Sequence, residues 1–165
     1  FYMNAQVQIQ IIKAIHLQNP NIPILAFDHN FDKEGILCCI EIAKQVGDLI
    51  KGFAFHNYNG QASNIEELKI YAHNLEFHHT EITSSRDSKG SFNWHKNQIK
   101  ELKEHNFLSY TYWNIFLNKN SGPNQRFPIF DGFYARPLIW IDKDSKEHKI
   151  IKTEEYKLFT DLSSQ

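Results

Sequence analysis

Apolar and polar residues alternate along the chain in two distinct patterns. Some stretches carry apolar side chains every three or four residues, which is the spacing of a helix with one buried face. Others are short, nearly continuous apolar runs, as expected of strands that are covered on both faces. The first pattern predicts helices over residues 3–18, 33–46, 63–72 and 94–104. The second predicts strands over residues 22–28, 50–56, 75–81 and 107–116.

Local chemistry supports the boundaries of these elements. Asp32 can cap the helix that begins at Lys33, because its carboxylate can accept a hydrogen bond from a free backbone N–H group. Two polar stretches, residues 82–93 and 118–128, are predicted as long loops, and loops of this length are often functional. The side chains of the second helix that are predicted to face inward are Ile36, Leu37, Ile40 and Ala43.

Strands and helices alternate along most of the chain, which predicts an α/β fold with a parallel sheet. The tail departs from this order. Residues 137–142 and 148–152 flank a polar turn and are predicted to form a β-hairpin that joins another sheet. Thr153 then caps a last helix, with Glu154 and Glu155 in the first turn, where negative charge is favourable.

Each predicted strand changes from apolar to polar or aromatic residues at its carboxyl end. Parallel strands bring these ends to one edge of a sheet or barrel, which is where such folds build their sites. Within a strand, His56 and Tyr58 also share a face, because side chains alternate with a period of two. The candidate site residues are Asp28, His56, Tyr58, Glu81, Trp113 and Asn114.

Composition narrows the possible classes of function. The chain has 165 residues, of which 41% are hydrophobic and 22% charged, so it is expected to bury a core as one globular domain. A net charge of −1, without a basic block, gives no reason to expect a nucleic-acid partner. No apolar run approaches the roughly 20 residues that a transmembrane helix needs. The adjacent Cys38 and Cys39 are expected to be buried small side chains rather than a disulfide.

The candidate residues combine carboxylates, an amide, an imidazole, a phenol and an indole. Aromatic faces beside carboxylates and amides suit a sugar, which has a C–H face and hydroxyl edges. Other interpretations stay open: Glu81 could form an ordinary ion pair, and at least one of His78 and His79 is expected in the core. A zinc site at His29, His56, His79 and Glu81 is a further alternative, but the spacing of these residues matches no common zinc motif.

Five runs of residues, in their order and spacing, carry a family resemblance. They are Phe27-Asp28-His29-Asn30, Gly52-Phe53-Ala54-Phe55-His56-Asn57-Tyr58, Thr80-Glu81, Tyr112-Trp113-Asn114-Ile115-Phe116-Leu117, and Gly122-Pro123-Asn124. Together they resemble the glucosylceramidase-like enzymes of glycoside hydrolase family 30, over roughly residues 20–142. The Trp-Asn strand end followed by Gly-Pro-Asn is the most distinctive part.

The resemblance implies a (β/α)8 TIM barrel fused to a β-sandwich, and hydrolysis of β-glycosides with retention of configuration. No metal or organic cofactor is implied. Glu81 matches the catalytic nucleophile at the end of barrel strand seven. His56 and Tyr58, at the end of strand six, match residues that line the sugar site and contact the nucleophile. Trp113 matches the indole that forms the floor of the sugar site, and Asp28 and Asn114 are expected to support substrate binding.

The chain also departs from the family pattern. Asn57 and Gln125 stand where the family usually has aromatic residues, and Ile82 follows the nucleophile where a small or acidic residue is usual. These changes put the leaving-group preference in question. The general acid/base of the family, a Glu in an Asn-Glu pair on strand four, has no counterpart here. The chain is therefore expected to be a fragment that holds strands five to eight and is inactive alone.

On this reading, residues 1–136 form the C-terminal half of the barrel, residues 137–152 the hairpin that joins the β-sandwich, and residues 153–165 the last barrel helix. The expected function is hydrolysis of a glycolipid or oligosaccharide through a glycosyl-enzyme intermediate on Glu81. The resemblance favours an extracytoplasmic location. A non-catalytic carbohydrate-binding remnant and a metal-dependent barrel hydrolase are the alternative functions.

Overall fold

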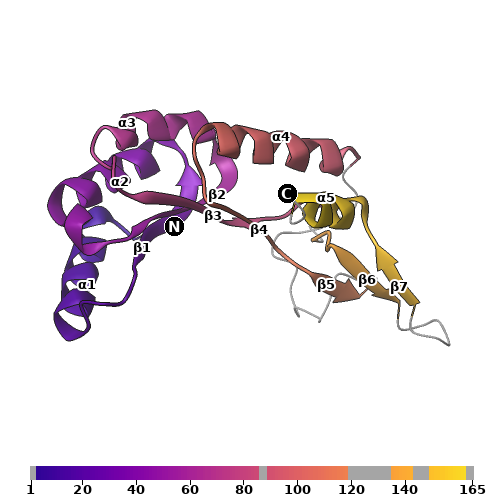
Figure 1. The fold of residues 1–165 in the computed structure, drawn as a ribbon, viewed down its shortest axis with the longest axis horizontal. Helices are drawn as coiled ribbons and strands as arrows, with labels where there is room; N and C mark the ends of the chain where they lie inside the picture. Colours follow the sequence, from indigo (N-terminus) through magenta and orange to yellow (C-terminus); the bar gives the residue numbers. More distant parts are fainter. Residues whose placement is uncertain (1–2, 86–88, 119–134, 143–148, 163–165) are drawn as a thin grey trace. The chain divides into compact units, whose positions relative to one another are not determined.

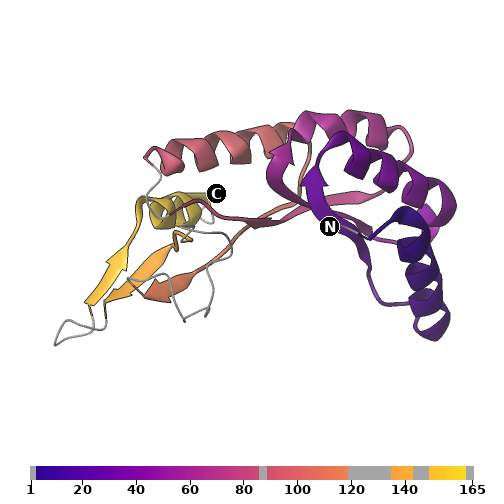
Figure 2. The ribbon, with the colours of Figure 1, turned by 180° about the vertical axis from the view of Figure 1, so that it is seen from behind.

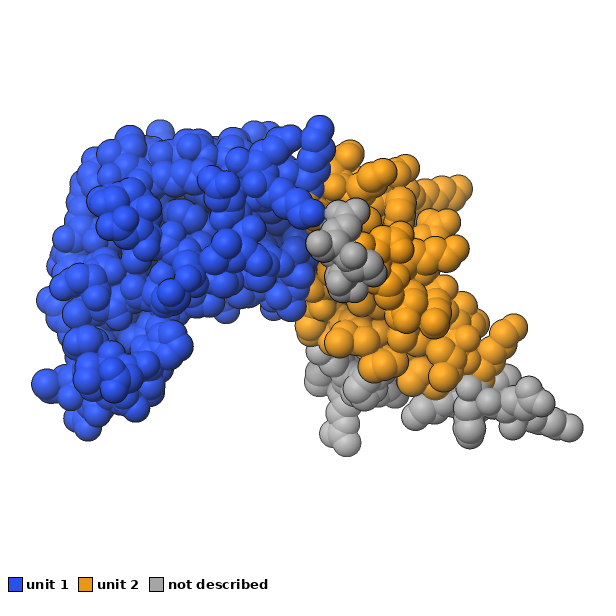
Figure 3. Space-filling model, viewed as in Figure 1, with its two compact units in different colours: residues 1–82, 100–111 blue, residues 83–99, 112–165 orange. Residues whose placement is uncertain are grey.

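The computed structural model describes residues 3–85, 89–118, 135–142 and 149–162. The chain separates into two compact units (Figure 3). Unit 1 comprises residues 1–82 and 100–111, and unit 2 comprises residues 83–99 and 112–165. Among the described residues, no helix is both long enough and apolar enough to span a membrane.

Unit 1 is built on a sheet whose strands lie in the order β1-β2-β3-β4 (Figure 1). These strands are β1 (Leu25–Phe31), β2 (Gly52–Gly60), β3 (Glu76–Ile82) and β4 (Ser109–Tyr112). β1 pairs with β2, and β2 pairs with β3, in parallel. The predicted α/β fold with a parallel sheet is therefore confirmed, and the strands are neighbours in the predicted order.

Helices α1 (Ala5–Gln18), α2 (Lys33–Val46) and α3 (Ile65–Lys69) flank this sheet (Figures 1 and 2). The side chain of Asn4 caps α1, and Asp32 caps α2 by accepting a hydrogen bond of 2.9 Å from the backbone N–H of Gly35. These caps satisfy N–H groups that the first turn of a helix leaves without partners. The buried faces of the helices and strands form one apolar core, which includes Ile9, Ile12, Ile36, Ile40, Phe53, Phe55, Leu68 and Phe77.

Two glycines shape β2, the strand that lies between β1 and β3. At Gly52 a Cβ atom would lie 2.1 Å from the carbonyl oxygen of Glu76, so β2 and β3 approach too closely there for any side chain. Gly60 has a φ of +84°, and a Cβ atom there would lie 2.3 Å from the backbone of Phe31. Both positions need glycine, and both keep β2 close to its neighbours.

Unit 2 contains a second sheet in the order β5-β6-β7, formed by β5 (Phe116–Asn118), β6 (Ile139–Asp142) and β7 (Lys149–Lys152). β6 and β7 are antiparallel, so the predicted hairpin is confirmed, while its turn lies outside the described residues. Thr153 caps α5 (Glu154–Leu162) by accepting a hydrogen bond from the N–H of Tyr156. A connection from this sheet to a β-sandwich stays a prediction.

Several predicted boundaries differ from the structure. The expected strand over residues 107–116 is in fact two strands, β4 and β5, which belong to different sheets. The predicted loop over residues 82–93 is shorter, because α4 (Ser91–Glu104) begins three residues earlier than expected. The predicted loop over residues 118–128 lies almost entirely outside the described residues.

The predicted inward position of Leu37 is wrong, since half of this side chain is exposed. The buried stripe of α2 instead runs through Ile36, Ile40 and Ala43, which are buried as predicted. Leu37 lies one turn before the exposed Glu41, on the polar face of the helix. The apolar character of Leu37 does not predict its exposure, because the helical rotation between Ile36 and Leu37 decides which face Leu37 occupies.

Candidate functional site

The site begins with a β-bulge at Asp28 in β1. Phe27 pairs with Ala54 of β2 and His29 pairs with Phe55, so Asp28 has no partner of its own in the ladder. Phe27 and Asp28 have φ values of +79° and +54°, in a region that residues other than glycine rarely adopt. Bulges of this kind concentrate next to active sites, where they redirect a side chain.

Gln8 of α1 supports this bulge. Its side chain is buried, and its Oε1 accepts a hydrogen bond of 2.9 Å from the backbone N–H of Phe27. The ring of Phe27 packs beside that of Phe55, with 5.5 Å between the ring centroids. The unusual backbone at Phe27 and Asp28 is thus held by a helix on one side and an aromatic core on the other.

A second bulge lies in β3, at Thr80. Phe55 pairs with His79 and His56 pairs with Glu81, so Thr80 is passed over in the ladder. In a regular strand, with Thr80 paired in the ladder, Glu81 would lie two residues after the fully buried His79 and share its face. The bulge instead brings Glu81 level with His56, which is partly exposed.

The two bulged residues meet across β2. Thr80 Oγ1 donates a hydrogen bond of 2.5 Å to Asp28 Oδ1, and His56 Nε2 lies 3.1 Å from the same oxygen. The hydrogen bond from His56 lowers the pKa of Asp28; burial opposes this shift, and Thr80 reinforces it. The bond to Asp28 in turn raises the pKa of His56, against the opposing effect of burial. Asp28 and His56 therefore form an ion pair in weakly acid solution.

Glu81 is bound by Tyr58, whose Oη donates a hydrogen bond of 3.1 Å to Glu81 Oε1. The Tyr58 ring packs edge-to-face against the ring of His56, with 6.1 Å between centroids. Almost half of the Tyr58 side chain is exposed, and Glu81 is half-buried. The carboxylate is thus oriented by a donor and remains accessible to a small molecule.

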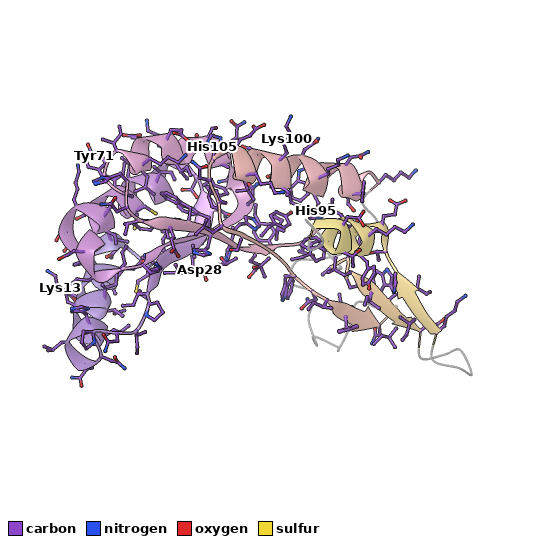
Figure 4. All side chains as sticks on the ribbon, viewed as in Figure 1. Lys13, Asp28, Tyr71, His95, Lys100 and His105 are labelled. Atoms are coloured by element: carbon purple, nitrogen blue, oxygen red, sulfur yellow. The ribbon has the colours of Figure 1, made fainter. Side chains whose placement is uncertain are left out.

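The structure brings together four predicted site residues, Asp28, His56, Tyr58 and Glu81, on neighbouring strands of unit 1 (Figure 4 labels Asp28). The predicted strands over residues 22–28 and 75–81 end at Asp28 and Glu81, and both of these ends are placed too early. β1 continues to Phe31 and β3 to Ile82, because a bulge lets a strand continue through a polar residue.

Three residues of this site were missed by the sequence reasoning. Thr80 holds Asp28, Gln8 holds the backbone at Phe27, and Asn30 accepts a hydrogen bond of 2.9 Å from the N–H of Tyr58 through its Oδ1. Thr80 and Asn30 lie next to predicted site residues in polar runs, which is a weak signal. Gln8 lies in a different element, and nothing in its local sequence connects it with Phe27.

Trp113 and Asn114 belong to unit 2, between β4 and β5. Both are partly buried, and the carbonyl oxygen of Asn114 accepts a hydrogen bond of 3.1 Å from the N–H of Leu138. Their convergence with Glu81 in one pocket stays a prediction. The Gly122-Pro123-Asn124 run and Gln125 lie outside the described residues.

The histidines of β3 have separate environments. His79 is fully buried and stacks on Tyr110, with 4.6 Å between ring centroids, which confirms that at least one of the pair lies in the core. His78 lies 3.1 Å from both Ser109 Oγ and Glu76 Oε2. Within the described part of the chain, no group of three or more His, Cys, Asp or Glu side chains is placed to hold a metal ion.

Comparisons with known proteins bear on the fold. No protein-family model matches the chain, and no curated protein matches it. The solved structure of the endo-β1,6-glucanase BT3312 matches 98% of this chain with a TM-score of 0.80 and 21% identity. SrfJ from Salmonella typhimurium matches 90% of it with a TM-score of 0.67 and 21% identity. The chain spans 38% and 34% of these two proteins, so it has the fold of little more than a third of each.

Proposed function

We propose that this chain is the C-terminal half of the (β/α)8 barrel of a retaining β-glycosidase similar to glycoside hydrolase family 30, with Glu81 as its nucleophile. The observation that carries the proposal is the hydrogen bond from Tyr58 to Glu81, beside the His56–Asp28 pair, on neighbouring parallel strands. The fold shared with an endo-β1,6-glucanase supports the same class of reaction. Parallel strands of such folds carry their sites at this edge.

Glu81 would act by attacking the anomeric carbon of a β-glycoside. A bond forms between its carboxylate oxygen and that carbon, while the glycosidic bond breaks through an oxocarbenium-like transition state. The leaving oxygen takes a proton from a general acid, and water then hydrolyses the glycosyl-enzyme ester. Tyr58 orients the attacking carboxylate through its hydrogen bond. The resemblance assigns the general acid to strand four, which we place outside residues 1–165, about 5–5.5 Å from Glu81 in the assembled barrel.

The substrate would be a β-glycoside whose hydroxyl groups bond to His56 and Asp28; the roles of Trp113 as a stacking surface and of Asn114 in substrate binding are what the family resemblance implies. Each of these residues offers the chemistry required: an aromatic face for C–H groups, and charged or amide groups for hydroxyl groups. The aglycone would be a glycolipid or an oligosaccharide. An extracytoplasmic location belongs to the same proposal.

Covalent labelling tests the role of Glu81. A protein that contains this chain and the preceding half of the barrel is treated with 2-deoxy-2-fluoro β-glycosides, and its peptides are mapped by mass spectrometry. We expect the label on Glu81, and we expect Glu81→Gln to abolish it while sugar binding persists. The exposed Glu104 provides a matched control, since Glu104→Gln should retain the label.

Two other results would contradict the proposal in different ways. A label on Asp28 would leave the site in place but assign the nucleophile wrongly. Sugar binding without label or turnover, in protein that includes the preceding half-barrel, would favour the alternative function, a carbohydrate-binding remnant that has lost its chemistry.

A further inference from the structure

Asp28 and Thr80 are bulged residues on opposite sides of β2. Asp28 is passed over between the pairs Phe27–Ala54 and His29–Phe55, and Thr80 between the pairs Phe55–His79 and His56–Glu81. The two bulges therefore lie on either side of Phe55, one residue apart along β2. Thr80 Oγ1 also lies 3.3 Å from the carbonyl oxygen of Phe55, so the two side chains meet over that peptide. The two irregularities flank one residue of β2, and the hydrogen bond from Thr80 to Asp28 joins them.

The hydrogen bonds at Asp28 favour its ionised form over its protonated form. The hydroxyl of Thr80 and the Nε2 of His56 both approach the same oxygen, Asp28 Oδ1, at 2.5 and 3.1 Å. Two donors on one oxygen stabilise an ionised carboxylate, because a protonated carboxyl group is a weaker acceptor of both hydrogen bonds. A general acid must instead hold a proton to deliver. Asp28 is therefore poorly suited to donate a proton and well suited to hold a cation.

His56 faces ionisable groups from three strands. Asp28 of β1 is bonded to it, and Glu81 of β3 adds a favourable negative charge. His29 of β1 lies 6.4 Å away, ring over ring, and would repel it if charged, but burial lowers the pKa of His29. Tyr58 of β2 presents its ring edge-to-face. The balance of these groups favours the protonated form of His56.

We propose that Asp28 and Thr80 form a paired-bulge clamp that holds His56 as an imidazolium beside Glu81. Asp28 and Thr80 are positioning residues in this arrangement, and Asp28 is not the acid that protonates the leaving group. The clamp itself concerns the ionisation of His56, whereas its effect on turnover rests on the proposed glycosidase function.

The clamp has a defined pH dependence. The bond to Asp28 raises the pKa of His56 above its ordinary value of 6.5, so the imidazolium is fully present below that value. It is lost as pH rises through the raised pKa. If His56 acts in the site as a charged donor, kcat/KM should fall along this basic limb. Removing Asp28 should move that limb to lower pH.

Histidine titration by NMR measures the pKa of His56 directly, without any substrate. In a protein that contains this chain and the preceding half of the barrel, the His56 signal is assigned with His56→Gln and followed between pH 4 and 9, with retained signal dispersion as the check of folding. Asp28→Asn should lower the His56 midpoint, because it removes the largest influence that raises the pKa of His56. Thr80→Val should shift it in the same direction but less, and Thr80→Ser, which keeps the hydroxyl, should restore it.

A second carboxylate–histidine contact in unit 1 provides the control. Glu66 Oε1 lies 2.6 Å from His105 Nδ1 at an exposed position, so Glu66→Gln removes a comparable partner away from the site. It should leave the His56 midpoint unchanged. An unchanged midpoint in Asp28→Asn, or equal midpoints in Thr80→Val and Thr80→Ser, would overturn the clamp.

The pH profile of the assembled enzyme separates the clamp from the proposed function. Asp28→Asn should shift the basic limb of kcat/KM to lower pH for aryl glycosides with good and poor leaving groups alike. A loss of about 10²–10⁴-fold that is confined to poor leaving groups would instead identify Asp28 as the general acid. A shifted His56 midpoint in a protein without hydrolytic activity would support the clamp and reject the glycosidase.

Discussion

At the scale of single residues, the site is a set of donors arranged around two carboxylates that have different partners. Asp28 is bonded by a hydroxyl and an imidazole, and Glu81 is bonded by a phenol. A carboxylate paired with a cation is held in place as an anion. A carboxylate that keeps a single oriented donor and partial exposure is available for attack on carbon. Two carboxylates of similar chemistry thus have different environments, and these differences support the different roles that we propose for them.

The hydrogen bond from Tyr58 should matter for turnover more than for folding. Tyr58→Phe removes one hydroxyl from a partly exposed ring, and a hydrogen bond to a charged group is worth about 1.5–3 kcal/mol. We expect kcat/KM of the assembled enzyme on aryl β-glycosides to fall by about 10- to 100-fold, with little change in thermal stability. Tyr71→Phe, at an exposed ring elsewhere in unit 1, should leave kcat/KM unchanged. An unchanged rate in Tyr58→Phe would contradict a role for this bond.

The Asp28–His56 pair should also give a pH-dependent contribution to stability. The pKa of Asp28 lies below its ordinary value of 3.8 and that of His56 above its ordinary value of 6.5. The contribution of the pair is therefore complete between these two values. It is lost as pH falls through the pKa of Asp28 or rises through that of His56.

Denaturant unfolding of a protein that contains this chain and the preceding half of the barrel, at several pH values, measures this contribution. The free-energy difference between the wild type and Asp28→Asn should be largest near pH 5–6 and should shrink above the pKa of His56. Glu104→Gln, at an exposed carboxylate, should show a small difference that does not change over this range. A constant difference for Asp28→Asn would rule out the ion pair as its cause.

At the scale of elements, unit 2 contains a buried charged contact between α5 and the chain just before β6. Glu155 is fully buried, and Arg136 Nε lies 3.0 and 2.9 Å from its two carboxylate oxygens, while Ser91 at the start of α4 also donates to it. Burial opposes ionisation of Glu155, but the bonds from Ser91 and Arg136 outweigh it, so its pKa is lowered. His95, labelled on α4 in Figure 4, is buried nearby in the same unit, and burial lowers its pKa to about 4.

Breaking this contact should destabilise unit 2. Arg136→Met leaves the Glu155 carboxylate buried without its cation, and removal of one partner from a buried ion pair costs about 3–5 kcal/mol. We expect faster hydrogen exchange in α5 and β6, measured by mass spectrometry. Lys100→Met, at a position whose side chain is 78% exposed, should leave exchange in these elements unchanged. Equal exchange in Arg136→Met and the wild type would show that packing alone holds α5.

At the scale of the whole molecule, the sheet of unit 1 has two edges. In the described residues β1 and β4 stand at the ends of the strand order, and β1 pairs with β2 alone. Open edges of a parallel sheet present unpaired backbone groups that a closed barrel would satisfy. The chain covers little more than a third of each structure whose fold it shares. These edges are where we propose that the remainder of a barrel attaches.

The isolated 165-residue chain should therefore be catalytically inactive and prone to self-association. Without a general acid, hydrolysis of aryl β-glycosides would lose about 10²–10⁴-fold, and exposed strand edges favour pairing between chains. Light scattering coupled to size-exclusion chromatography should detect species larger than a monomer. Addition of the preceding half of the barrel should restore both a monomer and turnover. A stable, fully active monomer of the isolated chain would contradict the half-barrel proposal.

The sequence alone determined the order and type of most elements of unit 1 and the hairpin of unit 2. Helical spacing in α2, the cap at Asp32 and the apolar run of β2 are local features, and local backbone preferences are enough to define them. The sequence also predicted that Asp28, His56, Tyr58 and Glu81 lie close together, because the carboxyl ends of parallel strands meet at one edge of a sheet.

Tertiary structure alone decided how those four residues meet. A bulge is a difference in register between two strands, so neither Asp28 nor Thr80 shows it without the pairing to β2. The same holds for Gln8, which reaches Phe27 from another element, and for the division of residues 107–116 between two sheets. Periodicity describes one segment at a time, whereas register and partner choice are properties of pairs of segments.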